Sequence, residues 1–152
     1  MSNPEEKLAA MGLSVPEVVK PLAAYVPAVR SGDYVYTAGQ LPMRGGVMMM
    51  TGKVGGEVAP EQAYECAKQC ALNALAAAAS VVGGVNNIKR IVKAVVFVAS
   101  TPDFTGQPGV ANGASELLGE VFGEAGIHAR SAVGVAVLPL DAPVEVELIV
   151  EV

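Results

Sequence analysis

The sequence predicts an α+β fold, with one sheet and two main helices on one of its faces. The patterns follow the order strands, helix, strand, helix and two strands, which is typical of such layered domains. Residues 94–99 are apolar at every position, as in a central strand. Residues 144–152 alternate valine or leucine with mostly glutamate, which predicts a half-buried strand with its valine face on the helices. The other face of the sheet then needs a cover.

The composition indicates one compact domain over residues 1–152, with a short helical extension over about residues 1–20. The 152 residues are 52% hydrophobic but only 5% aromatic, and they include 24 alanines and 25 valines. The core is therefore expected to consist of many small side chains. A domain of this length can bury a sizeable core without a disulfide or structural metal.

The charge pattern excludes several classes of partner. The net charge is −5 and no cluster of Lys and Arg occurs, so nucleic acid is not an expected partner. The longest uncharged stretch is too polar and too rich in glycine for a membrane span. The first residues include two glutamates where a secretory signal carries basic residues. We therefore expect a cytoplasmic protein that does not bind membranes.

Local signals set the element boundaries. Asn3 and Pro4 are typical of a helix N-cap and first turn, and this helix should end near Gly12. A hairpin turn is expected at Ser31 and Gly32. The remaining predicted elements are strands 25–29, 33–37 and 47–50, helix 60–82, strand 88–99, helix 108–124, and strands 130–138 and 144–152.

Few side chains are suited to covalent or metal chemistry. Cys66 and Cys70 are four residues apart, unlike a C-x-x-C site, and no histidine is near them in the sequence, so we interpret them as buried thiols. His128 is the single histidine, which leaves few routes to a nucleophilic pair and none to a His-rich metal centre. A structural role is the favoured interpretation of His128. The stretch 48–50, three methionines, could fill the core or line a pocket.

Arg130 is the most informative residue of the C-terminal half. It is the one cation between residues 94 and 152, against eight acids, and it leads into an apolar strand. Its guanidinium could hold a carboxylate through two parallel hydrogen bonds. The alternative is an ion pair with Glu145 or Glu147 on the following strand, and charge and position alone favour that simpler interpretation.

Glu145 is the second candidate. If strands 130–138 and 144–152 pair as antiparallel neighbours, Glu145 and Arg130 come to one end of the sheet. The carboxylate could then orient or deprotonate a water. A solvated polar strand face explains Glu145 and Glu147 equally well, and the residues alone do not separate the two. Tyr25, Tyr34 and Tyr36 are interpreted as sheet-packing residues, with the alternative that one hydroxyl faces a ligand.

Several segments resemble the Rid family of reactive-intermediate deaminases, also called the YjgF or L-PSP family. The similarity lies in Tyr-Thr-Ala-Gly-Gln-Leu-Pro at 36–42, Val-Val-Phe-Val at 95–98, Ala-Arg-Ser-Ala-Val at 129–133, Leu-Pro-Leu-Asp at 138–141 and Val-Glu-Val-Glu at 144–147. It extends from about residue 21 to the C-terminus. The motif around residue 130 is its most specific part.

The resemblance implies a chorismate-mutase-like fold that assembles as a homotrimer, with the sheets forming a central barrel and ligand clefts between subunits. It implies hydrolysis of small 2-imino or enamine acids to 2-keto acids and ammonia, without a metal or organic cofactor. Arg130 would hold the substrate carboxylate, Glu145 would position the water, and Tyr25 would line the cleft. Ala38 replaces a serine of deaminating members, and Ala132 often a cysteine.

Two other functions follow from the same resemblance. A trimer that binds small carboxylates without turning them over would keep Arg130 as its anchor, and the missing hydroxyl at Ala38 favours it. Some family members are associated with endoribonuclease activity, which the acidic balance of this chain disfavours.

Overall fold

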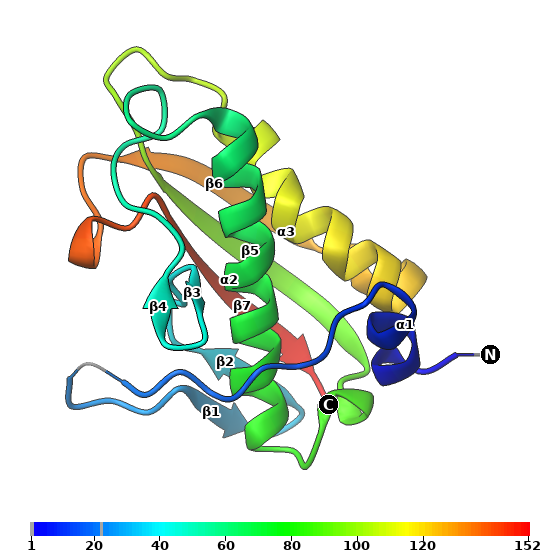
Figure 1. The fold of residues 1–152 in the computed structure, drawn as a ribbon. Coiled ribbons are helices and arrows are strands. Elements are labelled where there is room, and N and C mark those ends of the chain that lie inside the picture. The colour runs from blue at the N-terminus through cyan, green and yellow to red at the C-terminus, as the bar shows by residue number, and fades with distance from the viewer. Residues whose placement is uncertain (1, 22) are drawn as a thin grey trace.

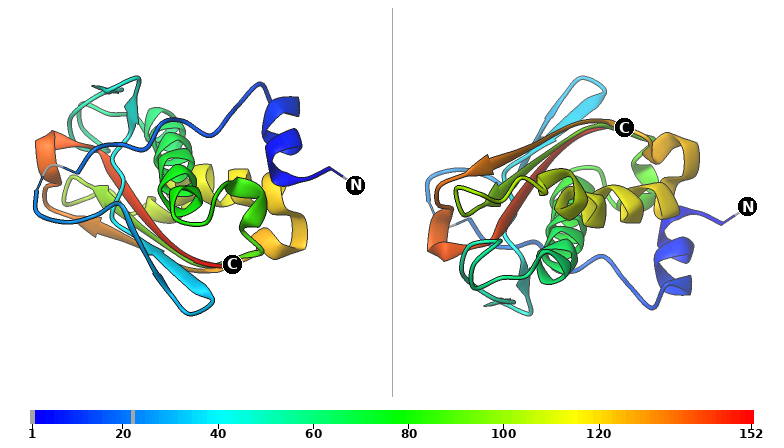
Figure 2. Two further views of the ribbon diagram at one scale, coloured as in Figure 1. Left: turned by 90° about the horizontal axis from the view of Figure 1, so that it is seen from below. Right: turned by 90° about the horizontal axis from the view of Figure 1, so that it is seen from above.

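The computed structural model describes residues 2–21 and 23–152, and it confirms an α+β arrangement with two long helices on one face of a sheet (Figure 1). Helix α2 (Pro60–Ser80) and helix α3 (Gln107–Phe122) pack against each other on that face. The two views of Figure 2 show the helices as one layer and the sheet as a second layer. The five strands are β1 (Ala28–Ser31), β2 (Tyr34–Thr37), β5 (Arg90–Ala99), β6 (Ala129–Val135) and β7 (Val144–Glu151).

The strand order is β1-β2-β7-β5-β6, so β7 lies in the middle of the sheet. Strands β5 and β6 are parallel, because α3 carries the chain back along the sheet between them, and the other pairs are antiparallel. The expectation that β6 and β7 pair as neighbours is wrong. Strand β7 has its apolar face under α2 at the sheet centre, and β5 separates it from β6.

The helix-facing side of β7 confirms the predicted alternation. Its even-numbered residues from Val144 to Val150 are buried, whereas the odd-numbered ones are only half-buried. Small residues let the two helices approach closely on this face. A Cβ added to Gly113 of α3 would lie 2.0 Å from the backbone oxygen of Tyr64 on α2. Alanine and glycine therefore form much of the contact between the helices, as the composition predicts.

Helix α1 (Pro4–Ala10) begins as predicted, with Asn3 Oδ1 accepting a hydrogen bond of 2.8 Å from the backbone N–H of Glu6. After α1 the chain crosses α2 before it reaches β1 (Figure 1). Three short 3-10 helices were not predicted. They are η1 (Val85–Asn87), η2 (Gly123–Gly126) and η3 (Pro139–Asp141).

Several boundaries differ from the prediction. The turn of the first hairpin consists of Gly32 and Asp33, one residue later than expected, because Gly32 adopts a φ of +60°. Strand β1 consequently starts at Ala28, and Tyr25 precedes it. Of the expected strand 47–50, only β4 (Val47–Met48) is extended, and it pairs with β3 (Met43–Arg44) in a separate small sheet.

In the described part of the chain, the face of the sheet opposite the helices is largely open to solvent. Val29, Tyr36 and Val133 on this face are 54%, 47% and 44% exposed. Such a patch is typical of an interaction surface. Among the described residues, no helix combines the length and the apolar character that crossing a bilayer requires.

Candidate active site

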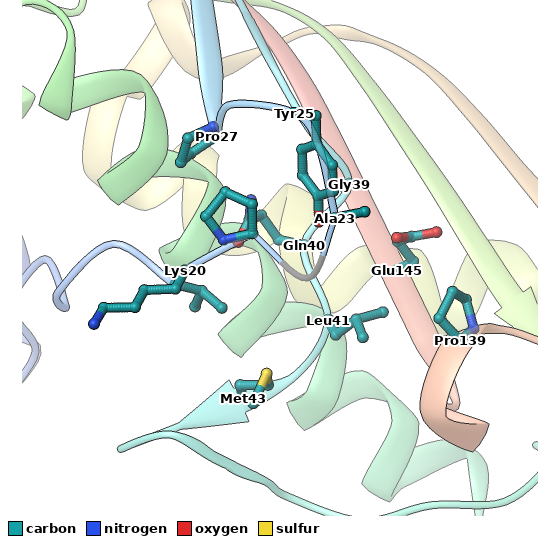
Figure 3. Close-up of a pocket in the computed structure, with 12 residues that line it drawn as sticks. Lys20, Ala23, Tyr25, Pro27, Gly39, Gln40, Leu41, Met43, Pro139 and Glu145 are labelled. Atoms are coloured by element: carbon teal, nitrogen blue, oxygen red, sulfur yellow. The ribbon is translucent and has the colours of Figure 1, made fainter.

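Glu145 lies in a hollow beside the sheet, a cavity of about 230 Å³ (Figure 3). Residues 19–21, 23, 25 and 27 form one wall, and residues 39–41, Met43 and Pro139 complete it. Most of the lining is apolar. The apolar residues are Val19, Pro21, Ala23, Pro27, Leu41, Met43 and Pro139. A single carboxylate therefore faces an apolar hollow large enough for a small organic acid.

The backbone of Gly39 allows the carboxylate of Glu145 to lie where it does. A Cβ added to Gly39 would come within 2.5 Å of Glu145 Oε2 and 2.7 Å of its carboxyl carbon. Burial, followed by the charge of Glu147, raises the pKa of Glu145 above its ordinary value. A carboxylate of raised pKa is a stronger base than an exposed one, so Glu145 is suited to taking a proton from water.

Buried amides of α2 hold the loop that carries Gly39. Asn73 Nδ2 donates to the backbone oxygens of Leu41 and Met43 at 3.0 and 2.9 Å, and Gln69 Nε2 donates to Asn73 Oδ1 at 3.1 Å. Gln40 also exchanges backbone hydrogen bonds with Val146 on β7. The sequence interpretation missed these amides, although two polar residues within an alanine-rich helix are a signal that could have found them.

Arg130 contacts α3 and neither glutamate of β7. Its Nη1 donates to Asn112 Oδ1 at 2.8 Å and to Ser115 Oγ at 3.1 Å. The expected ion pair with Glu145 or Glu147 is therefore wrong for the described part of the chain, where the one ion pair joins Lys53 and Asp141. The physical reason is the strand order, which places β5 between Arg130 and both glutamates.

Arg130 and Glu145 also point to different faces of the sheet. Arg130 is opposite Ala94 on β5 and Glu145 is opposite Phe97, three residues along the same strand. An odd separation places the two side chains on opposite faces. Strands lie about 4.8 Å apart and rise about 3.3 Å per residue, so the two Cα atoms are roughly 14 Å apart. Within one chain, these residues do not surround a common small ligand.

The other predicted residues lie in three places. Tyr25 lines the hollow with Glu145 and is 48% exposed. Ala38 precedes Gly39, and its N–H donates to the Pro27 oxygen at 2.7 Å. Ala132 follows Arg130 on the same face of β6 and packs partly against the core. Tyr34 and Tyr36 lie on the uncovered sheet face instead.

The histidine has a partner that the sequence interpretation missed. His128 Nε2 lies 2.9 Å from Ser115 Oγ, and its Nδ1 lies 2.6 Å from the backbone oxygen of Gly126. Ser115 follows Asn112 by three residues on α3, and His128 precedes Arg130 by two. The first spacing puts Asn112 and Ser115 on one face of α3, and the second is the repeat of an extended chain, in which alternate side chains point the same way. These two spacings are the signal that could have predicted the cluster.

The cysteines are buried free thiols, as predicted. Burial raises the pKa of Cys66 to about 11, and it raises the pKa of Cys70 well above its ordinary value. Both thiols therefore stay protonated at neutral pH. Met49 and Met50 pack against the core, while Met43 lines the hollow. In residues 2–21 and 23–152, no three His, Cys, Asp or Glu side chains lie close enough to hold a metal ion.

Comparisons with known proteins give consistent matches over nearly the whole chain. The sequence model of a family described as "YjgF/chorismate_mutase-like, putative endoribonuclease" matches residues 5–152. Protein TCP17 of Trypanosoma cruzi is 43% identical over 145 residues, which cover 95% of this chain and 91% of that protein.

Two further relatives have informative descriptions. A 2-iminobutanoate/2-iminopropanoate deaminase of Dermatophagoides farinae is 32% identical over 139 residues, 91% of this chain and 93% of that protein. A crystal structure from Shewanella oneidensis MR-1, with a provisional endoribonuclease description, superposes with a TM-score of 0.96 at 32% identity. That match covers 99% of this chain and 100% of the other.

Proposed function

The chain belongs to the YjgF/chorismate mutase-like family, and from that premise we propose that it hydrolyses small 2-imino acids to 2-keto acids and ammonia. The observation that carries the proposal is Glu145, a half-buried carboxylate of raised pKa in an apolar hollow. The 32% identity to a 2-iminobutanoate/2-iminopropanoate deaminase supports the same reaction class. Arg130 is the proposed anchor for the substrate carboxylate, and Tyr25 and the backbone at Ala38 border the site.

The proposed reaction needs only a bound acid and an oriented water. Glu145 accepts a proton from water as the water oxygen bonds to the imine carbon and the imine nitrogen takes up a proton. The nitrogen of the resulting carbinolamine then takes up a second proton, the carbon–nitrogen bond breaks and ammonia leaves, while the hydroxyl group gives up its proton and becomes the keto oxygen. Glu145 thus passes both protons of the water on to the nitrogen and ends ionised, as it began. Imines are reactive enough that positioning supplies much of the acceleration. The apolar walls accommodate the alkyl group of such a substrate.

A second copy of the chain is part of the proposal. Arg130 and Glu145 of one copy point to opposite sheet faces, so the site combines Glu145 of one copy with Arg130 of another. The uncovered sheet face, with Val29, Tyr36 and Val133, is the proposed contact between copies. A homotrimer with three such sites fits this arrangement, because a ring of head-to-tail contacts closes on itself.

Binding of small carboxylates without turnover is the second candidate, and Ala38 favours it. This position carries a methyl group instead of a hydroxyl beside Gly39, so the site has one fewer donor for a substrate or water. The two candidate functions differ in whether the bound imino acid is hydrolysed, whereas both include binding of small carboxylates. Both predict that pyruvate raises the melting temperature of the wild type and not of Arg130→Ala.

Freshly generated 2-iminopropanoate separates the two candidates. The deaminase proposal expects pyruvate and ammonia to be released in equal amounts, faster than in buffer and in proportion to protein concentration. A pyruvate-dependent melting shift with no acceleration of imine hydrolysis would instead establish the binding function. The absence of both effects would exclude both candidates.

A further inference from the structure

The guanidinium of Arg130 is anchored through one of its three nitrogens. Both of its hydrogen bonds, to Asn112 Oδ1 and to Ser115 Oγ, come from Nη1. Among residues 2–21 and 23–152, the structure gives no hydrogen-bond partner to Nε or Nη2. The edge formed by these two nitrogens carries parallel N–H groups, which is the geometry that grips a carboxylate with two bonds. The anchoring thus decides which way that edge points.

His128 determines how Ser115 meets Arg130. The Gly126 backbone oxygen can only accept, so the 2.6 Å contact requires a proton on His128 Nδ1. In a neutral ring Nε2 is then an acceptor, and it receives the Ser115 hydroxyl proton across 2.9 Å. The lone pairs of Ser115 Oγ are thereby left for Nη1 of Arg130. Each hydrogen bond in this chain polarises the next one.

We propose that Ser115 and His128 are positioning residues that orient the guanidinium of Arg130 for binding a carboxylate. The inference rests on the proposed role of Arg130. The chain of contacts runs from η2, through His128 and α3, to the edge strand β6 and ends at a half-buried guanidinium. A hydrogen-bonded chain that ends at an arginine with unused donors serves to aim those donors.

A nucleophilic role for the Ser115 and His128 pair fits the geometry less well. Ser115 lies in the middle of α3, where the surrounding backbone N–H groups already donate within the helix. No backbone donors are left there to stabilise an oxyanion. The group that orients His128 is a carbonyl, which cannot stabilise a charged imidazole as a carboxylate does.

The test compares variants of the full-length protein in two assays, imine hydrolysis and pyruvate binding. Ser115→Ala and His128→Leu break the chain at different points, and we expect each to raise KM and the pyruvate Kd about 5- to 30-fold while kcat changes less. His128→Gln keeps an acceptor for the Ser115 hydroxyl and should recover most of the loss. Ser80→Ala is the matched control, because its hydroxyl bonds only its own helix at Ala77.

Two combinations of variants separate positioning from a structural effect. In an Arg130→Ala background, Ser115→Ala should leave the pyruvate Kd unchanged, because the group that it orients is gone. Ser115→Ala with His128→Leu should cost no more than either alone, since both act through one chain. The inference would be overturned if the effects of Ser115→Ala and His128→Leu on the pyruvate Kd were additive. It would also be overturned if KM rose and kcat fell by the same factor and His128→Gln restored neither.

The outcomes also distinguish this inference from the proposed function. If wild type deaminates and Arg130→Ala is impaired but Ser115→Ala and His128→Leu match wild type, positioning is overturned and the deaminase stands. If wild type only binds pyruvate and the two variants weaken binding, positioning is supported and the deaminase fails. If wild type neither reacts nor binds, both proposals are overturned.

Discussion

Arg130 turns toward helix α3, whereas Glu145 lies on the opposite face of the same sheet, against the backbone of Gly39. Strand β5 separates the strands of the two residues. The sheet itself lies between the two side chains, so a small acid such as a 2-imino acid cannot contact both within one copy of the chain. The proposed chemistry therefore requires that one copy of the chain supplies the cation and another the carboxylate.

Mixing two inactive variants should restore activity. In an oligomer refolded from equal amounts of Arg130→Ala and Glu145→Gln, about a quarter of the clefts between copies combine an intact Arg130 with an intact Glu145. We therefore expect imine hydrolysis at up to about a quarter of the wild-type rate, well above the rate of either variant alone. Mixtures that are not unfolded first serve as the control. A refolded mixture as inactive as its components would contradict a site shared between copies.

Replacing Glu145 with glutamine should change how stability depends on pH. Because the pKa of Glu145 is raised above 4.5 in the folded protein, the folded state binds this proton more tightly than the unfolded state. The free energy of unfolding of the wild type thus falls as pH rises from the unfolded value through the folded one. Glu145→Gln should lack this contribution and be at least as stable as wild type at pH 7.

Activity should follow the opposite trend over the same window. A base must be ionised, so kcat of the wild type is expected to rise with pH through the raised pKa of Glu145. Chemical unfolding and initial rates between pH 4 and 8, roughly bracketing this window, measure both effects. Glu151→Gln, farther along the same strand, is the control. A kcat that is flat over this range would speak against Glu145 as the base.

Alanine at position 39 should damage the site and leave the fold intact. The added Cβ would lie 2.5 Å from Glu145 Oε2. The flexible Glu145 side chain can relieve this clash, but its carboxylate then leaves the place where it would act on the water. We expect kcat to fall at least about tenfold, the cost typical of a misplaced catalytic group, with little change in melting temperature. Gly109→Ala, which meets nothing within 4 Å, should keep both values. Wild-type kcat in Gly39→Ala would refute the proposed carboxylate position.

Alanine at position 113 should destabilise the fold. Its Cβ would lie 2.0 Å from the backbone oxygen of Tyr64 on α2. Because the clash is with backbone, no side-chain rotation can relieve it. We expect a loss of about 1–3 kcal/mol in the free energy of unfolding, as for other overpacked cores. Gly119→Ala lies in the same helix with nothing within 4 Å, and it should gain up to about 1 kcal/mol. Equal denaturation midpoints for the two variants would contradict close helix packing at Gly113.

Hydrophobic patterning predicted the long elements well, and it failed where strand order mattered. Alternation in 144–151 identified both the strand β7 and its buried face, because burial imposes a period of two. The short connection after β6 suggested a hairpin, yet the chain places β7 on the far side of β5. The alternation of apolar residues in a strand shows which of its faces is buried. It carries no information about which strands pair with it in the sheet.

The candidate site was predictable only in part. Arg130 and Glu145 stand out by charge and by resemblance, but their separation follows from tertiary structure. Asn73 and Ser115 act through partners 32 and 13 residues away, so local patterns can single out these residues but do not identify their partners. Gly39 is important because of the side chain that lies against it, and a single glycine in a sequence does not indicate its neighbour.

The most direct test of the account is the initial rate of pyruvate release from freshly generated 2-iminopropanoate by wild type, Arg130→Ala and Arg90→Ala. Arg90 is an exposed residue at the start of β5 and serves as the charge-matched control. We expect wild type and Arg90→Ala to accelerate release equally and Arg130→Ala to lose at least about 30-fold, the effect of removing one partner of a carboxylate–guanidinium pair. Full activity in Arg130→Ala, or no acceleration by wild type, would contradict the proposed deaminase.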